Sequence, residues 1–272
     1  MEGLRDAVAI VTGGARGIGA GVVRSFVKAG VNVVIADILE TEAAALAASQ
    51  GERCLFVRTD LRSDADIGAV VGRTVGHFGR IDFLINVACS YADRGFDSDR
   101  ANWHDVFDVN MIGHVMLVRA AHPHLVASGR GSVVHFASAS GHFAQAGRWI
   151  YPATKAAIEQ LTRSQALDLA SDGIRVNAVL PGWVRKDGYD QFPSDVKARY
   201  ESHARRLHMM GRLGEPDEIG EAVLYLCSAH AGFTTGAVLR VDGGYTALGP
   251  QGGDKVLPTA LRAAASQPGS ST

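Results

Sequence analysis

The sequence predicts an α/β fold: a single, doubly wound domain with about seven parallel strands and helices on both faces of the sheet. Two observations support this prediction. Short runs of apolar, mostly branched residues alternate with longer segments of helical spacing along most of the chain. Glycine or polar residues follow directly after several of the apolar runs, as they do at the carboxyl ends of parallel strands. A chain of 272 residues can bury the core that such a domain needs.

Each predicted element follows from its local pattern. The apolar runs place strands at 7–11, 31–37, 54–58, 81–85, 132–137 and 174–180, and a last strand and turn at 238–244. Helical spacing covers 20–30, 38–50, 64–78, 103–118, 151–171 and 215–229. Residues 184–211 break the alternation, and we expect one or two helices there that form a substrate lid. The domain is expected to span 1–248, with a C-terminal tail at 249–272.

The composition argues against several classes of function. A formal net charge of −1 provides no basic surface for nucleic acid or an anionic membrane. No apolar run approaches the ~20 residues that span a bilayer, and no secretory signal is evident. The cysteines Cys54, Cys89 and Cys227 are odd in number and widely spaced, which argues against disulfides or a metal site. We therefore expect a cytoplasmic enzyme that acts on a small molecule.

A glycine-rich turn joins the first strand to the first helix. Gly13, Gly17 and Gly19 have the spacing G-x-x-x-G-x-G. Glycine lets the backbone turn tightly and approach a pyrophosphate, which then lies at the helix N-terminus. Strand, glycine turn and helix together are the context of a dinucleotide-binding Rossmann domain. The sequence therefore predicts a bound dinucleotide.

The second strand ends in Asp37, which bears on the type of dinucleotide. An acid at this point accepts hydrogen bonds from the adenosine ribose and repels a 2′-phosphate. Arg16 in the glycine turn could instead meet a 2′-phosphate, but the acid is the stronger indication. We expect NAD rather than NADP.

Several predicted strands end in residues suited to one binding crevice. The carboxyl ends of parallel strands lie at the same edge of a sheet, so the residues that follow them converge. The residues concerned are Gly13, Asp37, Asp60, Asn86, Ser138 and Pro181.

Tyr151 and Lys155 are four positions apart at the start of a predicted helix, so their side chains lie on one face. A free phenol titrates near pH ~10 and is a poor base at neutral pH. An ammonium ~4 Å away, at an effective dielectric of ~20, favours the phenolate by ~4 kcal/mol. Tyr151 is therefore a candidate general acid and base.

With these motifs in place, residues 5–246 resemble the short-chain dehydrogenase/reductase family. The motifs are Thr12–Gly19, Asp60, Asn86-x-Ala88, Asn110, Ser138, Tyr151-x-x-x-Lys155, Pro181-Gly182, Arg212-x-Gly214-x-Pro216 and Thr235-Gly236 through Val241–Gly244. A weaker similarity, in the run Gly19–Arg24, in Gln145 and in the tail, is to the branch of L-fucose and type 14 17β-hydroxysteroid dehydrogenases.

The resemblance implies a role for each matching residue. Tyr151 would exchange a proton with the substrate oxygen, and Lys155 would support it and bind the nicotinamide ribose. Ser138 would hold the substrate oxygen, and Asn110 would fix a water in a proton relay. The implied NAD-binding residues are Gly13, Arg16, Gly17, Ile18, Gly19, Asp37, Asp60, Leu61, Asn86, Ala88, Tyr151, Lys155, Pro181, Gly182 and Val184. The resemblance also implies a homo-oligomer, a tetramer or a dimer.

Three positions depart from the family pattern. Val87 stands where the family has an asparagine, so a hydrogen bond to backbone within the sheet is expected to be either missing or supplied by water. Cys89 replaces a glycine and narrows the pocket near the nicotinamide. Lys186 replaces a threonine that in the family binds the carboxamide, so the family's anchor for the nicotinamide is not expected at this position.

Candidate substrate-binding residues flank the proposed catalytic ones: Ser138, Ser140, His142, Gln145, Arg148, Trp149, Tyr151, Trp183 and Arg185. Hydrogen-bonding groups mixed with flat aromatic faces favour a sugar, a polyol or a cyclic alcohol. An alternative is a ketone reductase or a hydroxysteroid-type dehydrogenase, whose pocket would be apolar. If Arg148 and Arg185 reach the pocket, a substrate that carries an acid or sulfonate group is another alternative. A third alternative is a dinucleotide-binding protein without catalysis.

Overall fold

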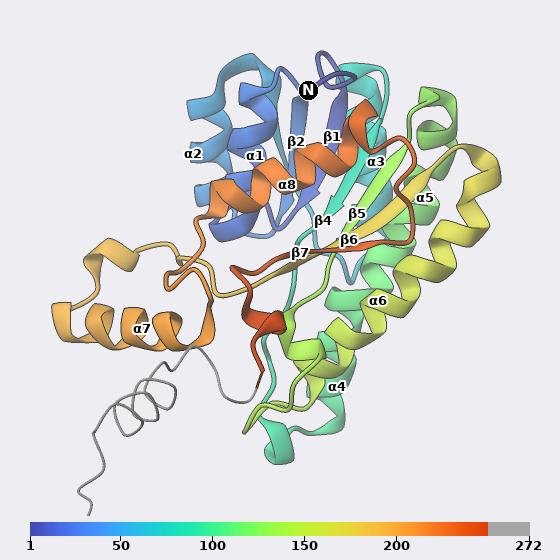
Figure 1. The fold of residues 1–272 in the computed structure, drawn as a ribbon. Helices are drawn as coiled ribbons and strands as arrows, with labels where there is room; N and C mark the ends of the chain where they lie inside the picture. The colour runs from blue at the N-terminus through green and yellow to red at the C-terminus, as the bar shows by residue number, and fades with distance from the viewer. Residues whose placement is uncertain (250–272) are drawn as a thin grey trace, which may run out of the picture.

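The computed structural model describes residues 1–249, which form one sheet of seven parallel strands flanked by helices (Figure 1). The strands are β1 (Val8–Thr12), β2 (Asn32–Asp37), β3 (Cys54–Arg58), β4 (Phe83–Asn86), β5 (Ser132–Phe136), β6 (Arg175–Pro181) and β7 (Val238–Val241). Their order in the sheet is β3-β2-β1-β4-β5-β6-β7, and every neighbouring pair is parallel. The predicted fold class is confirmed.

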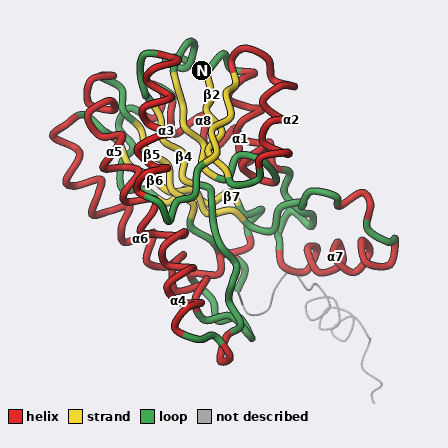
Figure 2. Tube along the Cα trace, turned by 180° about the vertical axis from the view of Figure 1, so that it is seen from behind, coloured by secondary structure: helices red, strands yellow, loops and turns green. Residues whose placement is uncertain are grey.

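Helices cover both faces of the sheet, as Figures 1 and 2 show from opposite sides. They are α1 (Gly17–Lys28), α2 (Glu40–Gln50), α3 (Asp64–Phe78), α4 (Arg100–Phe107), α5 (Gly113–Ser128), α6 (Ile150–Leu169), α7 (Ser194–Leu207) and α8 (Pro216–Cys227). One apolar core packs α1, α2 and α8 against the sheet, and a second packs α3, α5 and α6 against the other face. Burial on both faces explains why the strands are almost continuously apolar.

One predicted helix is divided in the structure. The pattern at 103–118 predicted a single helix, but a π-helical turn, Asp108–Ile112, separates α4 from α5. A π-turn adds one residue to the turn and changes the direction of the side chains within it. This turn contains Asn110.

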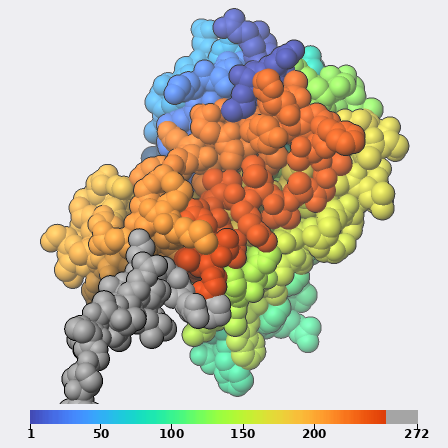
Figure 3. Space-filling model, in the orientation of Figure 1, coloured from blue at the N-terminus to red at the C-terminus, as the bar shows by residue number. Residues whose placement is uncertain are grey.

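The segment predicted as a lid lies beside the main body (Figure 3), and α7 projects from it (Figure 1). A small apolar cluster of Tyr189, Ala204 and Leu213 holds the segment together, with Trp183 and Tyr200 packed against it. Its role as a lid stays a prediction. The predicted tail lies outside the described residues, apart from Gly249.

Association of subunits also stays a prediction. Ile158 of α6 is 1% exposed and packs against the sheet within the chain, whereas Leu167 of the same helix is 79% exposed. Across residues 1–249, no helix is both long enough and apolar enough to cross a membrane.

Helix α1, whose N-terminus follows the glycine turn, is held by close contact with α8. A Cβ atom added at Gly21 would lie 2.5 Å from the backbone carbonyl of Pro216. One added at Gly220 would lie 2.5 Å from Oγ of Ser25. The two helices therefore approach each other at glycines, and α8 fixes the position of α1.

Replacing Gly21 with alanine tests this contact. Alanine normally stabilises a helix interior by ~1 kcal/mol relative to glycine. At Gly21 we expect the opposite sign, a loss of ~1–3 kcal/mol, because backbone must move to admit the methyl group. Gly72 of α3 is the matched control, since a Cβ there meets nothing within 4 Å. Urea denaturation of both variants measures the difference, and equal stability would contradict the proposed contact.

Candidate active site

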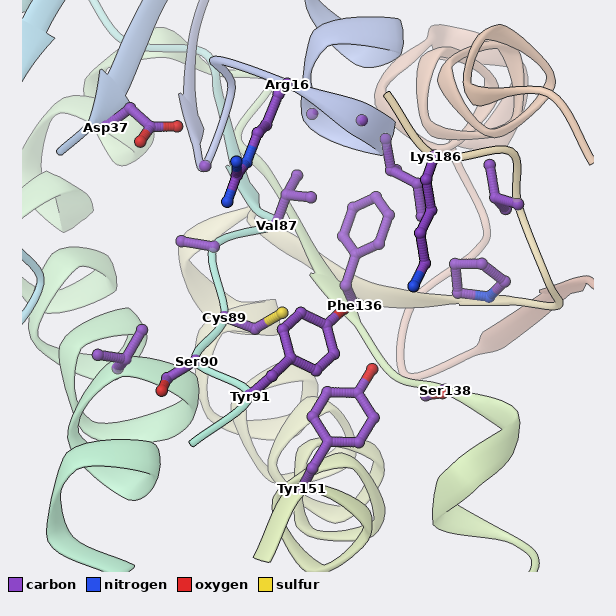
Figure 4. Close-up of a pocket in the computed structure, with 18 of the residues that line it drawn as sticks. Arg16, Asp37, Val87, Cys89, Ser90, Tyr91, Phe136, Ser138, Tyr151 and Lys186 are labelled. Carbon is purple, nitrogen blue, oxygen red and sulfur yellow. The ribbon is translucent and has the colours of Figure 1, made fainter. Parts of the chain in front are cut away.

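A cavity of about 960 Å³ lies at the carboxyl ends of the strands. Figure 4 shows its two ends, with Arg16 and Asp37 at one and Ser138 and Tyr151 at the other. Of the predicted residues, those that line it are Gly13, Arg16, Gly17, Ile18, Gly19, Asp37, Asp60, Leu61, Ala88, Ser138, Arg148, Tyr151, Lys155, Pro181, Gly182, Trp183, Val184 and Arg185. Most of the predicted set therefore converges on a single site.

The glycine turn leaves room only for backbone. Gly13 has φ of +63°, and a Cβ there would lie 2.7 Å from Cα of Ala88. A Cβ at Gly19 would lie 2.0 Å from the carbonyl oxygen of Gly13. The N–H of Gly17, at the start of α1, donates to the carboxylate of Asp187 at 2.6 Å. This helix N-terminus therefore binds an anionic group, here one from the lid segment.

Asp37 closes the adjoining end of the cavity. It is 7% exposed, and its carboxylate accepts hydrogen bonds from the backbone N–H groups of Ala15 (2.9 Å) and Leu39 (3.0 Å). The side chain therefore ties the end of β2 to the glycine turn. Arg16 lines the same end and makes no ion pair within residues 1–249.

Asp60 is held by a neighbouring guanidinium. Arg62 lies 2.8 Å from Asp60 and 2.7 Å from Asp105. Hydrogen bonding to Arg62 lowers the pKa of Asp60 below its usual range, against the opposing effect of burial. Asp60 is consequently charged at neutral pH, at the wall of the cavity.

Tyr151 and Lys155 lie one turn apart on α6, as predicted. Lys155 is 2% exposed, and its Nζ donates to the carbonyl oxygen of Phe136 at 2.8 Å. The same Nζ is 5.5 Å from the centroid of the Tyr151 ring. Across the cavity, Oγ of Ser138 accepts a hydrogen bond from the N–H of Ser140 at 3.2 Å. Ser140 itself does not line the cavity, so it supports Ser138 rather than reaching a ligand.

Asn110 is buried behind the cavity instead of lining it. Its Oδ1 accepts from the N–H of Ser90 at 2.7 Å, and its Nδ2 donates to the carbonyl of Ser90 at 3.2 Å. Nδ2 also lies 3.2 Å from Oγ1 of Thr154 on α6. Asn110 thus fixes the loop after β4 in relation to α6.

The side chain of Asn86 faces away from the cavity. It is 1% exposed, and its Nδ2 lies 3.1 Å from Nδ1 of His135. Burial lowers the pKa of His135 to about 4, so the ring is neutral. Its Nε2 donates to Gln165 at 2.7 Å, which leaves Nδ1 to accept from Asn86. Asn86 therefore belongs to the layer beneath α5 and α6.

Two other predicted substrate residues lie outside the cavity. Nε2 of His142 is 2.7 Å from the carboxylate of Glu159. Trp149 is 52% exposed and packs edge to face with Phe96, with ring centroids 5.8 Å apart. Trp149 directly follows Arg148, which lines the cavity, but its own side chain points elsewhere.

The two predicted arginines line the cavity but differ in their partners. Arg185 has its Nε 3.0 Å from Glu215 and its guanidinium 4.7 Å from the Tyr189 ring. Arg148 has no acidic partner among residues 1–249. Its N–H donates to the carbonyl of Gln145 at 3.2 Å, and Gln145 itself does not line the cavity.

The three residues that depart from the family pattern all line the cavity. The backbone N–H of Val87 donates to Oγ1 of Thr12 at 3.0 Å, while its side chain packs against the apolar core. Lys186 places its Nζ 5.9 Å from the ring of Tyr200. Cys89 lies beside Tyr91 (Figure 4).

Sequence reasoning missed Tyr91 and Asp187. Tyr91 follows the end of β4, so its position near a strand end was a usable signal. Its ring stacks on Tyr151, with centroids 4.8 Å apart and planes at 25°. Asp187 had no such signal, because its contact with Gly17 joins residues 170 positions apart.

Comparison with known proteins agrees with this geometry. A family model described as enoyl-(acyl carrier protein) reductase matches residues 13–246. The chain is 37% identical over 251 residues to a cis-4-hydroxycyclohexanecarboxylate dehydrogenase of Sinomonas cyclohexanicum, covering 91% of this chain and 99% of the relative. It is 37% identical over 242 residues to a 3-alpha-(or 20-beta)-hydroxysteroid dehydrogenase of Mycobacterium bovis, covering 88% and 89%.

An L-fucose dehydrogenase of Oryctolagus cuniculus is 35% identical over 242 residues, covering 87% of this chain and 84% of the relative. The family model extends from the glycine turn through the Tyr151 helix to the last strand. Together with the parallel sheet and the cavity at its carboxyl edge, they establish the family. The chain belongs to the short-chain dehydrogenases/reductases.

Proposed function

We propose that this protein is an NAD-dependent dehydrogenase that oxidises a secondary hydroxyl on a sugar, a polyol or a cyclic alcohol. The observation that supports it most is the placement of Tyr151, Lys155 and Ser138 at one end of the cavity. The glycine turn and Asp37 lie at the other end. A dinucleotide in the cavity would extend between the two ends.

The residues present fit such a cofactor. Members of the family generally use a nicotinamide dinucleotide. The turn at Gly13 and Gly19 is too tight for side chains, and both glycines line the cavity, where their backbone can meet a pyrophosphate. The carboxylate of Asp187 accepts a hydrogen bond from the N–H of Gly17, which supports an anion site at this point.

When bound, the nicotinamide would supply the acceptor for the substrate hydride. The chain's own residues manage the proton. Ser138 would donate a hydrogen bond to the substrate oxygen, and Tyr151 as phenolate would remove its proton. The buried ammonium of Lys155 stabilises that phenolate, and its N–H groups not bound to Phe136 can reach ribose hydroxyls. In the reverse direction Tyr151 returns the proton to a carbonyl oxygen.

The substrate class follows from the cavity walls and from the relatives. Tyr91, Tyr151 and Trp183 offer flat faces, and Ser138 offers a hydroxyl. The relatives are named for a hydroxycyclohexanecarboxylate, hydroxysteroids and L-fucose, all of them ring compounds. A second candidate is a cyclic alcohol that also bears an acid group, because Arg148 lines the cavity without an acidic partner in the described chain.

Tyr151→Phe tests the chemistry. In a screen of sugars, cyclic alcohols, cyclic hydroxy acids and steroids with NAD, the wild type should produce reduced cofactor. With the best substrate, we expect Tyr151→Phe to lose ~10³-fold or more in kcat, since the general base is gone. The dissociation constant for NAD should be unchanged, which serves as the control for folding. Turnover that survives in this variant would refute the proposed mechanism.

Asp37→Asn tests the choice of cofactor. The amide keeps an oxygen for a backbone N–H but removes the charge that repels a 2′-phosphate. We expect the wild type to bind NAD more tightly than NADP. In the variant, the ratio of the dissociation constants for NADP and NAD should fall by ~10-fold, which corresponds to ~1.4 kcal/mol. Calorimetric titration with both dinucleotides measures it. A wild-type preference for NADP would contradict the assignment.

Asp187→Asn tests the anion site at Gly17. The carboxylate of Asp187 must leave before a pyrophosphate can bind the same N–H. Removing its charge weakens that competition, so we expect NAD to bind ~3–10-fold more tightly. Asp190 is the matched control, because it lies in the same segment but is 88% exposed at its side chain. If Asp187→Asn and Asp190→Asn bind NAD equally, the competition does not exist.

A further inference from the structure

The loop after β4, residues 87–94, presents an aromatic side chain that the proposed mechanism does not use. Tyr91 stacks on Tyr151, with ring centroids 4.8 Å apart and planes at 25°. Figure 4 shows the two rings side by side, with both hydroxyls directed into the cavity. The hydroxyls of Tyr91 and Tyr151 lie at the same end of the stack, and Cys89 lies beside Tyr91. The proposed general base therefore has a second phenol against it.

The stack is fixed on both sides of Tyr91. Before it, Ser90 is held by Asn110 through its N–H at 2.7 Å and its carbonyl at 3.2 Å. After it, the carboxylate of Asp93 accepts from the N–H of Tyr151 at 2.9 Å and of Trp149 at 3.1 Å. The loop and the start of α6 are thus joined directly to each other. The backbone that carries each ring is therefore held in place relative to the other.

Asp93 remains charged in this position. Burial would raise its pKa, but hydrogen bonds from backbone N–H groups, including that of Tyr151, hold the pKa below its usual range. A charged acceptor forms the stronger kind of hydrogen bond with an N–H group. The anchor between the loop and α6 therefore persists across the neutral pH range.

We propose that Tyr91 is a positioning residue for Tyr151: its ring holds the phenol in place, and its hydroxyl donates a hydrogen bond that stabilises the phenolate. This inference rests on the proposed function. The proton of Tyr91 stays on Tyr91 throughout, so it supports the proton transfer without taking part in it. Asn110 acts in turn on Tyr91, through the loop.

The chemistry of the two phenols assigns donor and acceptor. Partial burial, with Cys89 and Tyr151 beside it, raises the pKa of Tyr91. Nζ of Lys155 lies 5.5 Å from the centroid of the Tyr151 ring, so in the proposed mechanism Tyr151 is the phenol that gives up its proton and Tyr91 is the one that keeps it. A hydroxyl that donates to a phenolate oxygen makes a charge-assisted bond, stronger than one between neutral groups.

Other groups around Tyr151 also act on it. Lys155 faces it from its own helix, Cys89 and Asp93 from the loop after β4, and Ser138 from the end of β5. Arg148 precedes it, and Lys186 lines the cavity from the lid segment. A change at Tyr91 leaves these groups in place, which makes the following comparison specific to Tyr91.

Tyr91→Phe retains the stack and removes the hydroxyl. We expect the pH at which kcat/KM reaches half its maximum in alcohol oxidation to rise by about one unit. At pH 7 the variant should lose ~10-fold in kcat/KM, and at high pH it should approach the wild type. Tyr225→Phe on α8 is the matched control and should leave the profile unchanged. A loss that is equal at every pH would overturn the proposal and leave Tyr91 as a wall of the pocket.

A titration without substrate separates this inference from the proposed function. Ultraviolet absorbance of tyrosinate, measured in the wild type and in Tyr151→Phe, gives the ionisation of Tyr151 by difference. The second pair is Tyr91→Phe and the double variant Tyr91→Phe/Tyr151→Phe. In this pair the midpoint of the Tyr151 ionisation should lie about one pH unit higher. An unchanged midpoint would overturn the role of Tyr91 even in an active dehydrogenase. A shifted midpoint would uphold it even if no alcohol is turned over.

Discussion

The site depends on one buried ammonium. Lys155 is 2% exposed, and its Nζ binds the carbonyl oxygen at the end of β5, on Phe136. A buried charge is costly unless it is hydrogen bonded or paired. No carboxylate lies within ion-pair distance of it in residues 1–249, and the ring centroid of Tyr151 is 5.5 Å away. In the proposed mechanism the phenolate of Tyr151 is the partner that offsets the cost of burying the ammonium.

The arrangement around this charge joins three parts of the fold. Strand β5 supplies the carbonyl that holds Lys155, and α6 places Tyr151 one turn before it. The π-turn between α4 and α5 lets Asn110 hold the loop after β4, which completes the wall opposite. At the far end, α8 positions α1 and so the glycine turn. Each part is packed against the sheet, so the site has a rigid support.

The sequence predicted the fold well because its signals are local. The strand at 54–58 and the helix at 64–78 occur with the expected bounds. The spacing of apolar residues and the residues that cap a helix are set by the local sequence of each element. Asn86 was placed in the crevice because it ends a strand, yet side chains alternate between the two faces and its own faces α5 and α6. Tyr91 and Asp187 meet their partners only through the tertiary fold, which a local pattern does not specify.

The central claim is that Lys155 and Tyr151 act together beside a nicotinamide. A crystal structure of the protein with NAD bound tests it most directly. The account predicts that Nζ of Lys155 donates to the ribose hydroxyls next to the nicotinamide while it still binds the carbonyl of Phe136. It also predicts the Tyr151 hydroxyl beside the nicotinamide ring. A structure in which the ammonium does not touch the ribose, or in which that hydroxyl faces away from the ring, would contradict it.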